Sequence, residues 1–83
     1  MIIEEGFGND YYGNLRIQNY PNLQSIVVKK NSLRNLKSLK ICNCEELKII
    51  EIEGLRSYYG AFYNVKSVII ESISEIIIFF LPS

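Results

Sequence analysis

The side chains that most readily perform chemistry are scarce in this 83-residue chain. It contains no histidine, which is the commonest general base and metal ligand. Two cysteines, Cys42 and Cys44, do not complete a zinc site without histidine. The carboxylate pair Glu51 and Glu53 could in principle transfer protons, but lysines lie nearby and charged runs of this kind are usually solvated faces. The sequence therefore predicts a protein that is not an enzyme, with no cofactor and no metal site.

Charge and hydropathy exclude two further classes. Nine basic and nine acidic residues cancel, so no global field attracts nucleic acid or an anionic membrane. The longest apolar run, Ile76 to Leu81, is far shorter than the roughly 20 residues that span a bilayer. No basic start with a long apolar core marks a secretory signal. Cys42 and Cys44 point to opposite faces of an extended segment and cannot easily pair, so a reducing compartment, by default the cytoplasm, is expected.

Protein binding is the function that remains, and a glycine- and tyrosine-rich stretch at residues 54–64 is one candidate site. Tyrosine and arginine are enriched in binding hot spots. The candidates in this stretch are Arg56, Tyr58, Tyr59 and Tyr63. The alternative is a longer surface turn whose tyrosines partly cover the core, and the sequence leaves both open.

The elements that would position these residues follow from an internal repeat. Six apolar positions recur with a 24-residue step, and a third copy follows after a 29-residue step. The five additional residues of the longer step lie in the stretch 54–64. The three copies place these positions at Leu15, Ile17, Tyr20, Leu23, Ile26 and Val28; at Leu39, Ile41, Cys44, Leu47, Ile50 and Ile52; and at Val68, Ile70, Ile73, Ile76, Phe79 and Leu81. Self-similarity of this length is typical of solenoids, whose units stack to bury a shared core.

Composition and spacing predict strands in each copy. Fourteen isoleucines against one alanine favour β-structure. The expected strands are 14–17, 37–41 and 66–70 in a first sheet, and 24–28, 48–52 and 77–81 in a second. The predicted fold is mainly β, a parallel β-solenoid of about three 24-residue coils with two short strands each and little or no helix. One domain, 1–83, would comprise an irregular segment 1–13 and repeats at approximately 14–35, 36–64 and 65–83.

Several polar positions receive structural roles under this scheme. Cys44 is expected to be a small buried filler. Asn19 and Asn43 recur at one corner and are expected to bind backbone groups of the turns. Lys29 and Glu53, one coil apart, are expected to form a surface ion pair that contributes at most about 1 kcal/mol.

The repeat resembles a known family. Leu36, Leu39, Ile41, Cys44 and Leu47 have the spacing of the leucine-rich repeat in its cysteine-containing form. The stretch 60–65, with Ala61 and Phe62, is similar to the corner of BspA-like leucine-rich repeats. The resemblance covers about residues 12–81. It implies partner recognition by the outer face of the first sheet, whose candidates form two columns: Arg16, Lys40 and Ile69, and Gln18, Cys42 and Glu71.

The last expected strand is apolar on both faces. Under the 29-residue step, Ile77, Ile78 and Phe80 would point outward, and a strand edge without a partner would adjoin them. This predicts either a fragment of a longer array or a C-terminal coil that docks on a partner or on a second copy of the chain. Two hypotheses follow. The first is a protein–protein interaction module that uses the first-sheet face and the stretch 54–64, and the alternative is a structural or self-assembling segment of an adhesin-like surface array.

Overall fold

A computed structural model describes residues 1–55, 57–72 and 75–82, and these residues form strands and turns without any helix. The seven strands are β1 (Ile2–Ile3), β2 (Asn14–Gln18), β3 (Ser25–Val28), β4 (Ser38–Cys42), β5 (Ile49–Glu53), β6 (Ser67–Ile70) and β7 (Ile77–Leu81). Among the described residues there is accordingly no helix long and apolar enough to span a membrane.

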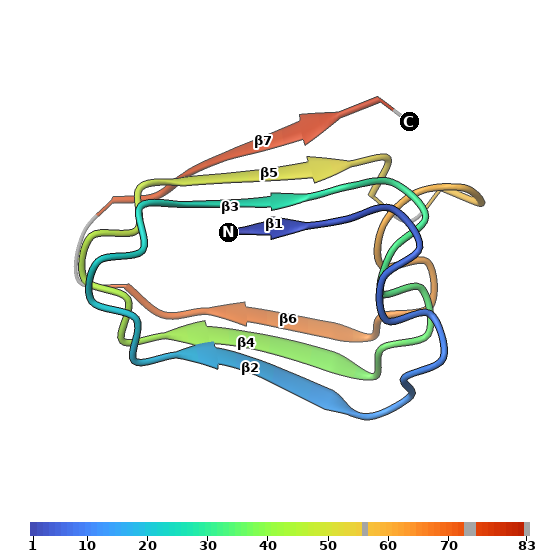
Figure 1. The fold of residues 1–83 in the computed structure, drawn as a ribbon, viewed down its shortest axis with the longest axis horizontal. Helices are drawn as coiled ribbons and strands as arrows, with labels where there is room; N and C mark the ends of the chain where they lie inside the picture. Colours follow the sequence, from blue (N-terminus) through green and yellow to red (C-terminus); the bar gives the residue numbers. More distant parts are fainter. Residues whose placement is uncertain (56, 73–74, 83) are drawn as a thin grey trace.

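The strands form two parallel sheets that face each other (Figure 1). One sheet has the order β1-β3-β5-β7 and the other the order β2-β4-β6. Each turn of the chain contributes one strand to each sheet, and sequence neighbours therefore lie in opposite layers. The chain is a parallel β-solenoid of about three turns, as the sequence predicts.

The register of most strands agrees with the 24- and 29-residue steps. In the β2-β4-β6 sheet, Ile41 lies opposite Ile17 on one side and Ile70 on the other. In the second sheet, Ile26 lies opposite Ile50, and Val28 lies opposite Ile52. Like residues thus form columns along the solenoid, and each column buries its members against the next coil.

The register of β7 differs by one residue from the register that the repeat predicts. Ile78 lies opposite Ile50 and Phe80 opposite Ile52, a 28-residue step in place of the expected 29-residue step. Parallel partners share a face, so Ile78 and Phe80 are directed to the core side, whereas Ile77 is directed outward. The expectation that Ile78 and Phe80 point outward was therefore wrong. A shift of one residue exchanges the two faces of a strand, and because all of β7 is apolar, the sequence pattern does not distinguish the two registers.

The N-terminal segment 1–13, expected to be irregular, contains β1 and forms half a coil. Ile2 and Ile3 lie opposite Val27 and Val28 in β3. The loop that follows stacks on the loop of the next coil, where the Leu33 amide donates to the Phe7 carbonyl at 2.8 Å. This half coil covers one end of the β3 strand, and it buries the Ile3 side chain.

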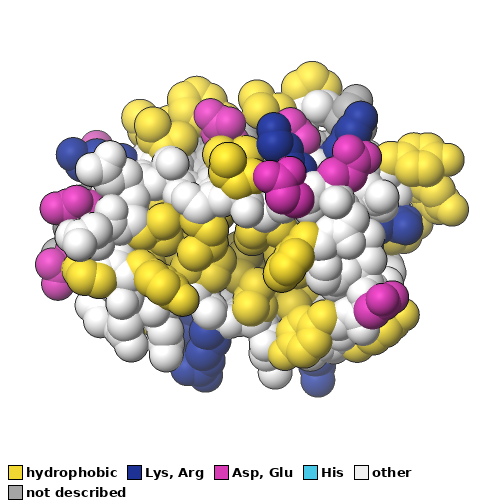
Figure 2. Space-filling view, viewed as in Figure 1, with side chains coloured by type: hydrophobic (Ala, Val, Ile, Leu, Met, Phe, Trp, Pro, Cys, Tyr) yellow, Lys and Arg dark blue, Asp and Glu magenta, His cyan; other side chains and the backbone are white. Residues whose placement is uncertain are grey.

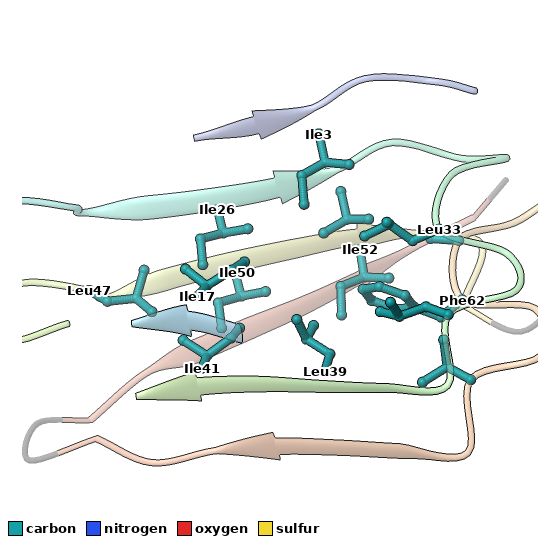
Figure 3. Packing of buried hydrophobic residues seen from close by; sticks show 14 of the residues in the cluster. Ile3, Ile17, Ile26, Leu33, Leu39, Ile41, Leu47, Ile50, Ile52 and Phe62 are labelled. Carbon is teal, nitrogen blue, oxygen red and sulfur yellow. The ribbon is translucent and has the colours of Figure 1, made fainter. Parts of the chain in front are cut away.

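The core fills the space between the sheets (Figure 3). Aliphatic side chains from both sheets point inward, and Leu33 and Phe62 close the core at one end. Leu33 and Phe62 have φ angles of 47° and 59°, a left-handed conformation that is uncommon for large side chains. Both side chains are fully buried, and burial of this size offsets the backbone strain.

In the first two coils the apolar repeat positions are buried or half-buried as predicted, with one exception, which is Tyr20. Tyr20, expected in the core, is 50% exposed because its corner belongs to the first full coil and no further coil covers it. Cys44 is buried, as predicted. Lys29 and Glu53 form the predicted ion pair at 3.7 Å, and Glu53 also accepts a hydrogen bond from the Lys30 amide. Ile73, the third member of the Tyr20 column, lies outside the described residues.

One corner between the sheets is built by stacked asparagines. Asn19 and Asn43 have φ angles of 65° and 54°, which asparagine tolerates better than most residues. The Asn43 side-chain amide donates to the side-chain oxygen of Asn19. The two asparagines were expected to bind backbone groups of the turns. The structure shows instead that their side chains bind each other across successive coils.

Candidate binding surfaces

The outer face of the β2-β4-β6 sheet carries the first group of candidates. Arg16 lies opposite Lys40, and Lys40 lies opposite Ile69, so the first predicted column is continuous across the sheet. Arg16 and Ile69 are exposed, and Lys40 is half-buried. Strand alternation explains this placement, because residues 15 and 17 of β2 turn toward the core and residue 16 turns away.

The second column lies at the ends of the same strands. Gln18 is opposite Cys42, and the Cys42 thiol donates to the Gln18 side-chain oxygen at 3.5 Å. Glu71 follows β6 and forms an ion pair with Lys40 at 3.4 Å. Within the described part of the chain Arg16 forms no such pair, so its charge is uncompensated there, whereas that of Lys40 is compensated.

A shallow depression at the corner adjoins this column. It is lined by Cys42, Asn43, Cys44, Glu45, Glu71 and Ser72. The Cys44 thiol donates to the Cys42 carbonyl at 3.4 Å and is directed into the core side of the corner. No group of three or more His, Cys, Asp or Glu residues within the described ranges is arranged to hold a metal ion.

The second group of candidates forms an aromatic cluster around an arginine. The Tyr58 ring meets the Tyr59 ring edge to face at 4.7 Å between centroids, and it meets the Tyr63 ring at 5.6 Å. The Arg34 guanidinium carbon lies 5.2 Å from the Tyr58 ring centroid and 5.1 Å from that of Tyr63. Cation–π contacts occur within about 6 Å, so Arg34 contacts both rings. These four residues are called the Tyr–Arg cluster below.

Arg34 also fixes the backbone of this loop. Its Nη2 atom donates to the Tyr58 carbonyl at 2.9 Å. Sequence reasoning missed Arg34, although a signal existed. Arg34 and Tyr63 are separated by the same 29-residue step that relates the second copy to the third, so they belong to one column. Arg56, the remaining candidate of this stretch, lies outside the described residues.

A close backbone approach shapes the base of the same loop. A Cβ atom on Gly60 would lie 1.4 Å from the Gly54 carbonyl oxygen, so only glycine fits there. The Ala61 amide donates to the Glu53 carbonyl at 3.0 Å, which returns the chain to the solenoid directly after the insertion. The inserted residues therefore leave and rejoin the coil at adjacent points, and the tyrosines project from it.

The two groups of candidates do not form one surface. The β2-β4-β6 sheet lies at the bottom of Figure 1, and its outer face is turned away from the other sheet. The loop that carries Tyr58 and Tyr59 projects from the end of the solenoid at the right. The chain therefore offers two separate candidate surfaces.

The fold defines the chain as a parallel β-solenoid protein. No protein family model, curated protein sequence or solved structure matches the chain. Its assignment to this class therefore depends on the strand order and the register of its coils.

Proposed function

We propose that this chain is a protein-binding module of the leucine-rich repeat type, in which the Tyr–Arg cluster is the main contact and the outer face of β2-β4-β6 is a second one. The cysteine-containing and BspA-like character is part of this proposal. Burial of Cys44, and of Ala61 and Phe62 at the corner, supports it.

The observation that carries the proposal is the combination of order and exposure in the Tyr–Arg cluster. Tyr58 remains 60% exposed although its carbonyl accepts a hydrogen bond from Arg34 and its ring contacts Tyr63, and Tyr59 remains 69% exposed although its ring contacts that of Tyr58. Rigid, exposed aromatic side chains bind with little loss of conformational freedom and are typical of hot spots. A turn that served only to cover the core would bury these rings.

The outer face of β2-β4-β6 supplies contacts of a different kind. Exposed Arg16 and Ile69 flank the Lys40–Glu71 ion pair, giving a mixed surface of one apolar side chain and one cation that has no ion-pair partner among the described residues. Mixed surfaces of this kind give specificity through charge complementarity. We expect this face to contribute less binding energy than the Tyr–Arg cluster, because its charges remain in water.

A selection of displayed random peptides against the immobilised chain tests the proposal. Peptides recovered on the wild type are then measured for binding to Tyr59→Ala, to Arg16→Ala and to Tyr11→Ala, a control that changes an exposed tyrosine outside both surfaces. The proposal expects Tyr59→Ala to weaken most recovered peptides by about tenfold or more, as loss of a hot spot does. Arg16→Ala should weaken a smaller set, and Tyr11→Ala should have no effect.

The opposite pattern contradicts the proposal. If the recovered peptides bind Tyr59→Ala and Arg16→Ala as tightly as the wild type, neither surface is a preferred binding site. Circular dichroism of each variant establishes that the fold is intact, so that weaker binding reports lost contacts and not unfolding.

A further inference from the structure

Both ends of the coil stack expose core-type side chains beside unpaired strand edges. At the C-terminal end, β6 and β7 have neighbours on one side only, and Val68, Ile78 and Phe80 are exposed. At the N-terminal end, the space between β1 and β2 is a hollow with hydrophobic walls (Figure 2). The hollow is lined by Met1, Ile2, Ile3, Phe7, Leu15, Arg16, Ile17 and Tyr20.

Columns of inward-facing residues have an apolar side chain at both the N-terminal and the C-terminal end of the stack. Leu15 and Ile17 begin the columns that end in Val68 and Ile70. Ile3 begins the column that passes through Val28 and Ile52 and ends in Phe80. An apolar side chain at one end therefore has an apolar counterpart at the other.

Columns of polar residues likewise have similar side chains at both ends of the stack. Asn64 donates its side-chain amide to Asn35, and Asn35 donates to the Asn9 carbonyl, so asparagine occupies this position at both ends. Ser38 donates to Asn14 at the start of the first sheet. Ser67 lies opposite Ser38 and has the same hydroxyl at the C-terminal end.

We propose that the chain stacks head to tail with a second copy of itself, the C-terminal end of one copy against the N-terminal end of the next. In this arrangement β6 pairs in parallel with β2 of the second copy, and β7 pairs with β1. Each column then continues into the second copy with the same chemistry that joins coils within one molecule.

Charge complementarity favours this direction of stacking. Within the molecule, Lys40 pairs with Glu71 of the neighbouring coil. In the stacked pair, Arg16 of the second copy lies opposite Ile69, and Glu71 is two residues further along the same face. Diagonal neighbours on a sheet lie within reach of long side chains. Arg16, which forms no ion pair within the described residues, thereby obtains an acidic partner.

The outline of the end face is compatible with a small specific contact. The molecule measures 32 × 25 Å across its two longer axes, and Figures 1 and 2 view it along the third. An ellipse of these axes has an area of about 630 Å², so a contact over the full outline of both copies would involve about 1,250 Å² in total, at the lower end of the roughly 1,200–2,000 Å² buried in specific interfaces. We therefore expect reversible association that depends on concentration.

Sedimentation equilibrium with variants at each end tests the proposal. Phe80→Lys places a charge at the C-terminal end, and Tyr20→Lys places one at the N-terminal hollow. The matched control for Phe80 is Ile77→Lys, a residue of β7 with nearly the same exposure (58% against 61%) that points to the outer face. The control for Tyr20 is Tyr12→Lys, which is exposed but does not line the hollow.

Head-to-tail stacking makes a specific prediction for mixtures. The wild type and both controls should gain mass with concentration, and each end variant alone should remain a monomer. An equimolar mixture of Phe80→Lys and Tyr20→Lys should form a dimer and nothing larger, because one unblocked end of each kind remains. If Phe80→Lys does not fold by circular dichroism, Val68→Lys replaces it at the same end.

Three results would overturn the proposal. A wild-type monomer at all concentrations excludes self-association. Association of Tyr20→Lys to the same extent as the wild type, with Phe80→Lys monomeric, indicates a symmetric contact between two C-terminal ends. A mixture of folded end variants that stays monomeric excludes the head-to-tail arrangement. None of these results depends on the Tyr–Arg cluster, so the proposed binding function is tested separately.

Discussion

Ile52 and Phe80 lie opposite each other in neighbouring parallel strands and are related by a 28-residue step, whereas a 29-residue step relates Ile41 and Ile70 in the other sheet. The third coil is therefore one residue shorter on its way from the first sheet to the second than the copies before it. Ile76, which precedes β7, still packs against the core as predicted. The consequence is that Ile78 is directed to the core side and Phe79 to the outer face, the reverse of what the repeat predicts.

This register predicts an order of stability in β7. Ile78→Asp places a charge beside buried Ile50, whereas Phe79→Asp places one beside half-buried Glu51 on the outer face. We expect Ile78→Asp to lower the free energy of unfolding by about 1–3 kcal/mol, since a charge near the core loses hydration. Phe79→Asp should cost less, although phenylalanine is the larger residue. Urea denaturation measures both, and the reverse order would favour the 29-residue register.

The asparagine corner predicts a preference for glycine over alanine. The φ angle of Asn19 is 65°, and alanine has a steric penalty there that glycine does not have. We expect Asn19→Ala to be less stable than Asn19→Gly by about 1 kcal/mol, although both lose the hydrogen bond to Asn43. Thermal denaturation measures the difference.

Asn22 serves as the matched control for this prediction. It is an exposed asparagine of the same corner, and it does not have a positive φ angle. At Asn22 glycine should be no better than alanine. The same order at both positions would show that the backbone conformation of Asn19 is not the cause.

The Tyr–Arg cluster predicts that Arg34 holds the inserted loop. Arg34→Ala removes the hydrogen bond to the Tyr58 carbonyl and two cation–π contacts. If these contribute about 1–2 kcal/mol to local stability, hydrogen exchange of amides at residues 57–63 should accelerate about 5- to 30-fold. Arg16→Ala, which changes an arginine of the sheet face, should leave these rates unchanged. Equal rates in Arg34→Ala and the wild type would show that the loop is ordered without Arg34.

The columns of the first two coils could be predicted from the sequence because their strands alternate. In β4, Leu39 and Ile41 are buried and Lys40 is not, so only one register places apolar residues inside. In β7 every residue is apolar, and the pattern carries no information about which face is inner. The solenoid was therefore predictable from the sequence, whereas the register of its last strand was not.

The two candidate surfaces also differ in how far the sequence predicts them. The sheet-face columns follow directly from strand alternation and the repeat. The 29-residue step places Arg34 and Tyr63 in one column, but the contacts of Arg34 with Tyr58 depend on how the inserted loop folds back, which no period in the sequence specifies. Exposure of Tyr20 has a third cause, since the repeat marks its position as apolar but does not indicate that the end of the stack leaves this corner uncovered.

The most direct test of the stacked coils is a methyl nuclear Overhauser spectrum of the chain with labelled isoleucine, leucine and valine. The account predicts cross-peaks from Ile41 to both Ile17 and Ile70, and from Ile50 to both Ile26 and Ile78. Contacts confined to residues three or four positions apart, with none between these partners in successive coils, would contradict it.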